Sequence, residues 1–200
     1  MYSVRLKNIV KSFEKKRVIK DFSFSFEKEK IYKISGPNGI GKTTLLKIIK
    51  GIIIPDKGEI SFANSKEKHS SVSYVDSNCR SFLHRLTVSQ NLKYFLSLNK
   101  AEKNLGKANE ILEQFNISHL IDINFSTLSL GQMQIVSFIR SVLEEPDILL
   151  LDEVFSNLDN ENLYMISDYV NNQKNKGNSI IYCSHGVDLP LNVNEEIKLY

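Results

Sequence analysis

The segment Gly36–Thr44, which reads G-P-N-G-I-G-K-T-T, limits the possible folds of this chain more than any other part of its sequence. It matches the pattern G-x-x-x-x-G-K-[ST], in which glycines let successive backbone N–H groups turn inward toward phosphate oxygens. That pattern works between a strand and a helix. The apolar segment 31–35 precedes it and the Leu- and Ile-rich segment 44–50 follows it, as this arrangement requires. We therefore predict a phosphate-binding loop.

The side chains of this loop have separate predicted roles. Lys42 supplies a mobile positive charge for the β- and γ-phosphates of a nucleotide, and the Thr43 hydroxyl is a ligand for Mg²⁺. The positive dipole end of the following helix adds to the attraction for anions. We therefore expect ATP and Mg²⁺ as cofactors, and the loop residues expected to bind the nucleotide are Gly36, Pro37, Asn38, Gly39, Ile40, Gly41, Lys42, Thr43 and Thr44.

A second chemical pattern lies at the end of a buried strand. Residues 148–153 read I-L-L-L-D-E, an apolar run that closes with two carboxylates. In α/β folds, ligands bind at the carboxyl edge of the sheet, where such a strand ends. Asp152 is predicted to bind Mg²⁺, either directly or through one of the ion's own ligands. Glu153 is the predicted base that polarises the attacking water. Alone, the D-E pair fits a helix N-cap equally well, but beside the phosphate loop it indicates catalysis.

Strand and helix patterns alternate along the chain and predict an α/β core with a parallel sheet. Phe22, Phe24 and Phe26 alternate with polar residues, which is typical of a half-buried strand. Segment 148–151 is apolar throughout, as in strands covered on both faces. Further strands are expected at 31–35, 71–75 and 179–184, and a turn and strand at 57–62. Helices are expected at 44–50, 88–96, 108–115, from Gly131 to Pro146, and around 160–175.

Five other segments carry a family resemblance. L-S-L-G-Q at 128–132 resembles the L-S-G-G-Q signature of ATP-binding-cassette ATPases, and it lies upstream of Asp152 as in that family. The resemblance extends over essentially the whole chain, with the motifs in the family's order. The remaining four are K-S-F (11–13) at the site of the aromatic that stacks on adenine, T-V-S-Q-N-L (87–92) at the start of the helical subdomain, S-N-L-D (156–159) at the D-loop, and Ser184-His185 at the switch histidine.

This resemblance implies a particular architecture. The expected fold is a P-loop NTPase core with a mostly parallel sheet, an N-terminal antiparallel β subdomain and an inserted helical subdomain. Residues 1–200 would then form a single ATPase domain. Its nucleotide-binding core would comprise residues 1–78 and 145–200, and residues 79–144 would form the helical subdomain with the signature.

The resemblance also implies how the site is assembled. In this family two cassettes pack head to tail, and each nucleotide lies between the phosphate loop of one subunit and the signature of the other. The signature of this chain would therefore act on the nucleotide of a second cassette. The residues that receive roles are Ser129, Gly131 and Gln132 in the signature, Asp159 in the D-loop, Phe13 against adenine, and His185 at the γ-phosphate, with Lys42 and Glu153 as the other catalytic residues.

The chain departs from the family pattern at three places. Leu130 stands where the signature has its first glycine, and Val154 stands where a proline usually follows the glutamate. The third departure concerns a glutamine that touches Mg²⁺ and links the site to the membrane subunit. Ser77 holds that position when counted from the preceding strand, and Asn78 when counted back from L-T-V (86–88). Either one would reach the metal only through a water, so we expect weakened coupling.

Composition sets the predicted location. The longest apolar stretches are far shorter than the roughly 20 residues that span a bilayer, and the first residues lack the apolar core of a signal peptide. The two cysteines, Cys79 and Cys183, form no metal-binding pattern and are expected to be reduced thiols. We therefore expect a cytoplasmic protein that contacts the membrane only through a permease subunit, with a second ABC ATPase, identical or different, as its other partner and no direct nucleic-acid contact.

A transporter ATPase subunit is the leading interpretation, and the segment L-T-V-S-Q-N-L-K-Y-F (86–95) favours an exporter. Two alternatives stay open. One is a soluble cassette ATPase that acts on ribosomes or DNA, although such proteins usually carry two cassettes in one chain or long coiled-coil or Cys-rich insertions. The other is a weakly active regulatory module, which Leu130 and the missing glutamine would favour.

Overall fold

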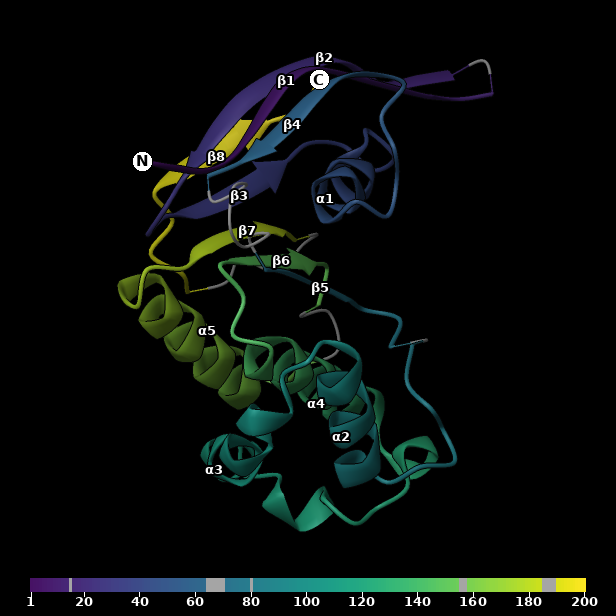
Figure 1. Cartoon of the computed structure of the whole chain (residues 1–200), viewed down its shortest axis with the longest axis vertical. Coiled ribbons are helices and arrows are strands. Elements are labelled where there is room, and N and C mark those ends of the chain that lie inside the picture. Colours follow the sequence, from purple (N-terminus) through teal and green to yellow (C-terminus); the bar gives the residue numbers. More distant parts are fainter. Residues whose placement is uncertain (15, 64–70, 80, 155–157, 185–189) are drawn as a thin grey trace.

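Two β-sheets and a set of helices make up the computed structural model of this chain (Figure 1), which describes all 200 residues except 15, 64–70, 80, 155–157 and 185–189. A three-stranded sheet has the order β2-β1-β4, and a five-stranded sheet has the order β5-β6-β7-β3-β8. The predicted α/β class is confirmed, including its antiparallel and parallel parts. Among the described residues, none of the helices combines the length and apolar character needed to cross a membrane.

The antiparallel sheet is formed by β1 (Tyr2–Phe13), β2 (Lys16–Glu27) and β4 (Lys57–Phe62). The predicted alternation is confirmed, because Phe22, Phe24 and Phe26 turn to the inner face while the residues between them are exposed. Phe26 is fully buried, and its ring centroid lies 5.0 Å from that of Tyr32 in the other sheet. These aromatic residues therefore pack the two sheets together. The sequence patterns did not predict β1.

The parallel sheet is formed by β5 (Val72–Asp76), β6 (Ile148–Asp152), β7 (Ser179–Cys183), β3 (Ile31–Ser35) and β8 (Glu195–Lys198). Every residue of β6 and β7 is buried, as expected for central strands covered on both faces. The strand β8 was not predicted. Because all five strands are parallel, their carboxyl ends meet at one edge of the sheet, which is the edge that the sequence motifs identify.

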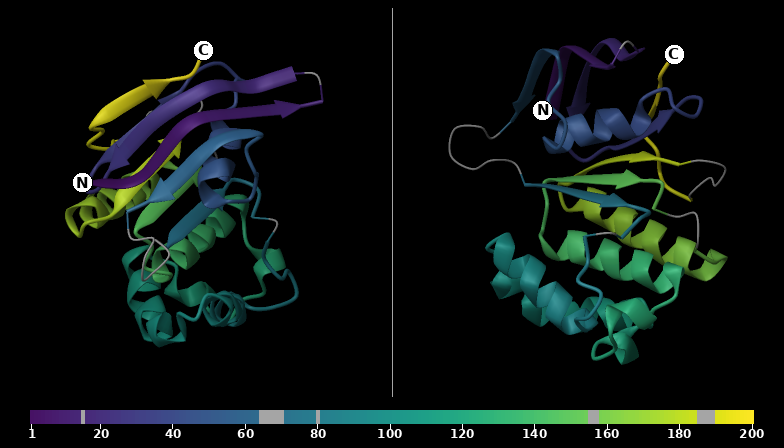
Figure 2. Two further views of the ribbon diagram at one scale, coloured as in Figure 1. Left: turned by 45° about the horizontal axis from the view of Figure 1, so that its top comes forward. Right: turned by 90° about the vertical axis from the view of Figure 1, so that its right-hand side faces the viewer.

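Helices cover both faces of the parallel sheet. Figures 1 and 2 show α1 between the two sheets and α4 and α5 against the opposite face, with α2 and α3 farther out. Two hydrophobic cores follow from this layering, one around α1 and one around α4. The helices are α1 (Lys42–Lys50), α2 (Val88–Leu98), α3 (Gly106–Gln114), α4 (Leu130–Leu143) and α5 (Asn160–Asn175), with short 3-10 turns η1 (Glu102–Leu105), η2 (Ser118–Leu120) and η3 (Phe125–Thr127).

Three of these helices lie in the connection between two neighbouring strands of the parallel sheet, β5 and β6. The chain leaves the sheet at the end of β5, forms α2, α3 and α4, and returns as β6. Helix α4 packs on β5 from below in the view of Figure 1. The helices thus lie within the segment 79–144 that the sequence assigns to a helical subdomain. The division of the chain at residues 78 and 145 itself stays a prediction.

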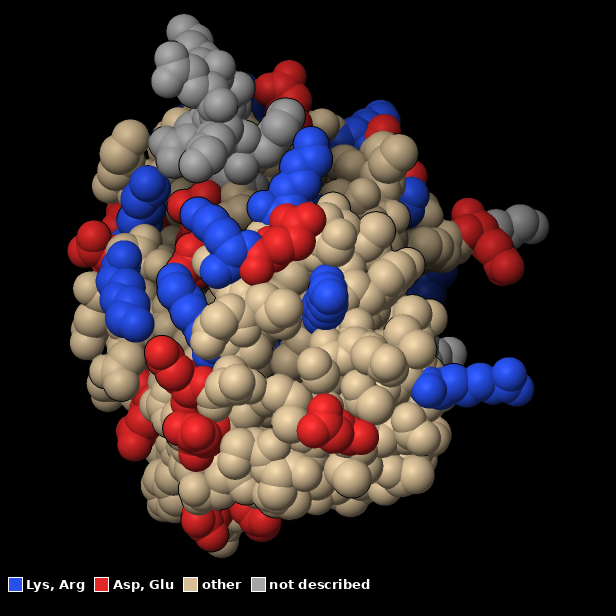
Figure 3. All heavy atoms as spheres, turned by 60° about the horizontal axis from the view of Figure 1, so that its bottom comes forward, with Lys and Arg blue, Asp and Glu red and all other residues tan. Residues whose placement is uncertain are grey.

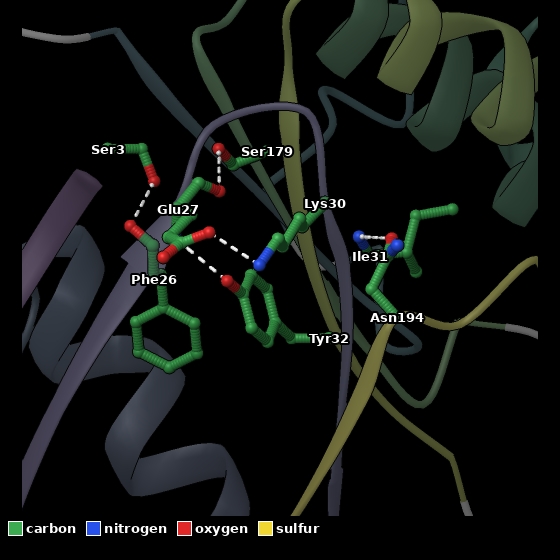
Figure 4. A network of polar contacts seen from close by, with 8 residues as sticks. All are labelled: Ser3, Phe26, Glu27, Lys30, Ile31, Tyr32, Ser179 and Asn194. Atoms are coloured by element: carbon green, nitrogen blue, oxygen red, sulfur yellow. Dashed lines mark hydrogen bonds and ion pairs between the residues drawn. The ribbon is translucent and has the colours of Figure 1, made fainter. Parts of the chain in front are cut away.

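Polar contacts join the two sheets at the edge opposite the phosphate loop, around Glu27 (Figure 4). The Glu27 backbone N–H donates to the Tyr32 hydroxyl at 2.8 Å, and the Ser179 hydroxyl donates to the Glu27 carbonyl at 3.0 Å. The Ser3 hydroxyl donates to the carbonyl of Phe26 at 3.1 Å. These bonds satisfy backbone groups where β2 turns into β3. The bonds of Tyr32 and Ser179 tie the antiparallel sheet to β3 and β7, and the Ser3 bond lies within the antiparallel sheet.

We predict that Gly58 is essential to the pairing of β4 with β1. Its φ of +97° is left-handed, and a Cβ there would lie 2.5 Å from the carbonyl oxygens of Lys7 and Asn8. Gly58→Ala should therefore lower the free energy of unfolding in urea by more than about 2 kcal/mol, since the backbone must shift. Gly51→Ala is the control, because Gly51 is also left-handed but has no atom within 4 Å of its Cβ position. Equal losses in the two variants would contradict this account.

Candidate nucleotide-binding site

The phosphate loop runs from the end of β3 to the start of α1. Gly36, Gly39 and Gly41 all have positive φ, which turns the backbone between strand and helix. Lys42 is the first residue of α1 and is only 6% exposed. Its Nζ donates to the carbonyl oxygens of Gly36 at 2.8 Å and Pro37 at 3.2 Å. The ammonium group is thus held inside the loop, within reach of any anion that the loop would cradle.

A hollow of about 350 Å³ opens over this loop. Phe13, at the end of β1, lines it and is 45% exposed, and Glu153 lines it as well. The structure therefore brings together residues from the antiparallel sheet, the loop and the end of β6. The complete lining comprises Phe13, Val18, Asn38, Gly39, Gly41, Lys42, Thr43, Thr44 and Glu153. That Phe13 stacks on adenine stays a prediction, but the residue lies at the hollow and not in the core.

Three donors converge on the Asp152 carboxylate at the end of β6. The Thr43 hydroxyl and the Cys183 thiol donate to Oδ1, each at 2.9 Å, and the Tyr74 hydroxyl donates to Oδ2 at 2.6 Å. Burial, and then the neighbouring carboxylate, raise the pKa of both Tyr74 and Cys183 well above their usual values. Both groups therefore stay protonated and can act as donors to Asp152.

The oxygen atoms at this point suit a Mg²⁺ ion. Thr43 and Asp152 supply a hydroxyl and a carboxylate, which are the hard ligands that Mg²⁺ prefers, and the ion commonly binds through one or two protein groups plus phosphate and water. The two side chains come from α1 and β6 and are already in contact. Their chemistry and position are those expected for a metal ion bound beside the phosphates of a nucleotide.

Glu153 directly follows Asp152 and has an unusual backbone. Its φ of +54° is left-handed, and its backbone N–H donates to the Cys183 carbonyl at 3.1 Å. A left-handed glutamate costs roughly 1–2 kcal/mol, and such strain is frequent at functional sites. The bend leaves Glu153 lining the hollow rather than continuing the strand. A carboxylate at this place is positioned to accept a proton from a water in the hollow.

The segment after β5 holds the two candidates for the missing glutamine. Ser77 is half-buried and Asn78 is exposed, and neither is among the described residues that line the hollow. The backbone N–H of Asn78 donates to the Asp76 carboxylate at 3.1 Å. In the strand register, Asp76 lies directly beside Asp152. Whether Ser77 or Asn78 reaches a metal through water stays a prediction.

The signature residues lie at the start of α4. Ser129 is the N-cap: its hydroxyl accepts from the Gln132 backbone N–H at 3.3 Å, and the Gln132 side-chain oxygen accepts from the Ser129 N–H at 2.9 Å. This capping box fixes the helix N-terminus. Leu130 is 64% exposed and points away from the core. Ser129, Gly131 and Gln132 line a second hollow, of about 460 Å³, together with Asp159.

The two hollows are separate parts of the surface, since they share no lining residue within the described part of the chain. Asp159 also caps α5, because its carboxylate accepts from the backbone N–H of Asn162 at 2.8 Å. His185 lies outside the described residues. So do residues 156 and 157, the first two of the D-loop motif 156–159.

Tyr74 and Cys183 are the contacts that sequence reasoning missed. Both belong to strands that flank β6, on either side of Asp152. Cys183 in β7 pairs directly with Asp152 in register. On the other side of β6, Asp76 in β5 pairs with Asp152, and Tyr74 lies two residues before Asp76. A period-2 count on the two flanking strands would have placed all three side chains on one face, but only with the strand register known.

Known proteins resemble this chain along most of its length. The family model for ABC transporters matches residues 19–156. The lipopolysaccharide export system ATP-binding protein LptB of Haemophilus influenzae is 30% identical over 199 residues, which cover 94% of this chain and 82% of that protein. The molybdate/tungstate import ATP-binding protein WtpC of Thermococcus kodakarensis is 34% identical over 188 residues, which cover 90% of this chain and 56% of that protein.

A solved structure has the same architecture. The nucleotide-free ATP-binding cassette from an ABC transporter superposes with a TM-score of 0.84 at 27% identity, and the match covers 100% of this chain and 88% of the other. The likeness includes both sheets, and it agrees with the predicted P-loop NTPase fold.

Lys42→Ala tests the phosphate loop. It removes a charge-assisted contact of about 1.5–3 kcal/mol, so ATP should bind at least about tenfold more weakly in a titration with a fluorescent ATP analogue. Lys47→Ala removes an equal charge from the same helix, farther from the loop, and should leave affinity unchanged. Wild-type affinity in Lys42→Ala would exclude Gly36–Thr44 as the site.

Proposed function

This chain belongs to the ABC transporter family, as an ATP-binding subunit with ATPase activity, and on that premise we propose that ATP-driven closure of two such subunits powers an exporter. The observation that carries the proposal is the convergence at one hollow. The phosphate loop, the Thr43–Asp152 contact and the strained Glu153 all lie there. Binding, metal retention and water activation would then take place side by side.

ATP would bind over the loop, with its phosphates beside Lys42. The ammonium group would exchange the carbonyl oxygens of Gly36 and Pro37 for β- and γ-phosphate oxygens. Mg²⁺, when bound at Thr43 and Asp152, would neutralise part of the negative charge of the phosphates. Glu153 would accept a proton from the attacking water, and His185 would hold that water in line. Phe13, at the edge of the hollow, would stack on the adenine ring.

Closure would require a second cassette, identical or different. Ser129, Gly131 and Gln132 line a hollow of their own, separate from the phosphate loop, which supports their acting on the nucleotide of the partner. The N-terminus of α4 is the positive dipole end of the helix, which favours a γ-phosphate. Asp159 lies in the same hollow, so the D-loop would meet the partner there too. Binding energy available only in the pair would drive the closed state.

We also propose a membrane permease as the other partner, with this chain on the cytoplasmic side. Figure 3 views the helical end of the molecule, where charged side chains gather in the upper middle and on the left, with others at the right and lower edges, and a broad area between them carries few. A hollow of about 370 Å³ with a mainly apolar surface lies between α2 and η1, lined by Gln90, Lys93, Tyr94, Leu96, Ser97, Glu102 and Leu105. The segment 79–144 would thus supply the docking surface, and residues 1–78 and 145–200 the nucleotide core.

Export is the finer part of this proposal. The relatives support transport but not its direction, since LptB serves lipopolysaccharide export and WtpC serves molybdate/tungstate import. Direction rests on the segment 86–95, which opens α2 and resembles the corresponding segment of export-type members of the family.

Glu153→Gln tests the motor. The amide keeps the shape of the side chain but accepts no proton, so steady-state ATP hydrolysis should be abolished while ATP affinity is retained. The trapped nucleotide should hold two chains together, giving a dimer in size-exclusion chromatography with Mg·ATP and a monomer without it. Glu113→Gln changes an exposed carboxylate on α3 and serves as the control. Wild-type turnover in Glu153→Gln would reassign the base, and a monomer with bound ATP would contradict closure.

A further inference from the structure

The Asp152 carboxylate is held by more groups than the phosphate loop supplies. Thr43 belongs to that loop, but the shortest contact comes from Tyr74 in β5, whose hydroxyl lies 2.6 Å from Oδ2. A phenol O–H that donates to a carboxylate at such a distance forms a charge-assisted bond, about twice as strong as a neutral one. Asp152 is itself only 5% exposed, so little water competes for its oxygens.

The fold determines where the Tyr74 hydroxyl lies. Tyr74 packs against the core around α1, which includes Leu45, and its backbone pairs with Leu150 in β6. Side chains alternate along a strand, so Leu150 and Asp152 share one face of the sheet, and Tyr74 lies on that face as well. The ring is therefore anchored by apolar packing, and the hydroxyl reaches forward along the sheet to the carboxylate.

Both oxygens of Asp152 are thereby committed. Oδ2 accepts from Tyr74, while Oδ1 accepts from Thr43 and Cys183 on the opposite side. A carboxylate held in this way resists rotation about its Cβ–Cγ bond. It can offer a metal one oxygen at a time, but it cannot turn both toward the ion without losing the bond to Tyr74.

Metal ions differ in how they use carboxylates. Mg²⁺ demands near-octahedral geometry with short bonds and takes one oxygen from each carboxylate or a bridging water. Ca²⁺ takes six to eight ligands and readily accepts both oxygens of a carboxylate. A locked Asp152 therefore suits the smaller ion and penalises the larger one.

We propose that Tyr74 is a positioning residue that locks Asp152 in the one-oxygen geometry and so sets a preference for Mg²⁺ over Ca²⁺ in the nucleotide complex. The inference rests on the proposed function, because it concerns the metal that accompanies ATP. Tyr74 itself touches neither metal nor nucleotide. It acts through Asp152, by the hydroxyl group alone.

The test uses the full chain and the variant Tyr74→Phe, which keeps the ring and removes the hydroxyl. Binding of a fluorescent ATP analogue is titrated in EDTA, and then with increasing Mg²⁺ or Ca²⁺. Affinity in EDTA should match wild type. The Mg²⁺ concentration for half-maximal enhancement of binding should rise about tenfold, because the freed carboxylate must be ordered when the ion binds, with a much smaller change for Ca²⁺.

Tyr32→Phe is the matched control. It also deletes the hydroxyl of a buried tyrosine in the same parallel sheet, but that hydroxyl accepts from the Glu27 backbone N–H at the opposite edge of the sheet. It should alter thermal stability without changing the metal titrations.

The outcomes separate the two proposals. If wild type itself binds ATP no better with Mg²⁺, the proposed function fails. If wild type responds to Mg²⁺ and Tyr74→Phe responds identically, only the role of Tyr74 is wrong. A loss of affinity already present in EDTA, or the same shift in Tyr32→Phe, would also overturn it, because the hydroxyl would then act on the fold and not on the metal.

Discussion

The hydrogen bond between the Thr43 hydroxyl and the Asp152 carboxylate connects the two halves of the candidate site. It joins the start of α1 to the end of β6 at 2.9 Å, across 109 residues of sequence. The Lys42 ammonium group bonds back to the loop carbonyls, whereas the Thr43 hydroxyl ties the start of α1 to the end of β6. The parallel arrangement of the strands makes the bond possible, since it brings the ends of β3, β5, β6 and β7 to one edge.

Much of this edge could be predicted from the sequence because its signals are local. The segment 31–35 was predicted as a strand and matches β3 at both ends, and 148–151 differs from β6 by one residue. The segment 57–62, predicted as a turn and strand, is strand β4 throughout. Continuous apolar runs, a glycine-rich turn and a helix stopped by Gly51 are each readable within about ten residues. The contact of Thr43 with Asp152 then follows from the paired motifs, without knowledge of the strand register.

What the sequence could not predict depends on pairing between distant segments. β1 carries lysines and a left-handed Asn8, and its pairings shift register several times, so its apolar residues do not alternate regularly. β8 has only Ile197 buried among charged residues. The roles of Tyr74 and Cys183 depend on which strands flank β6 and in what register. The choice between Ser77 and Asn78 depends on a turn whose Cys79 is left-handed, which counting along the chain cannot supply.

The missing glutamine leaves the segment after β5 tied to the helices by other side chains. The guanidinium of Arg140 in α4 lies 4.9 Å from the Phe82 ring and 4.6 Å from the Phe95 ring, and it donates to the Ser81 hydroxyl at 2.8 Å. Glu144, the C-cap residue of α4, accepts from the Ser73 hydroxyl in β5. The contacts of Arg140 tie Ser81 and Phe82, at the far end of that segment, to the helix whose N-terminus carries the signature, so a displacement of Ser81 and Phe82 would act on α4. This route to α4 does not pass through the side chain of Ser77 or Asn78, and weakened coupling at that position stays a prediction.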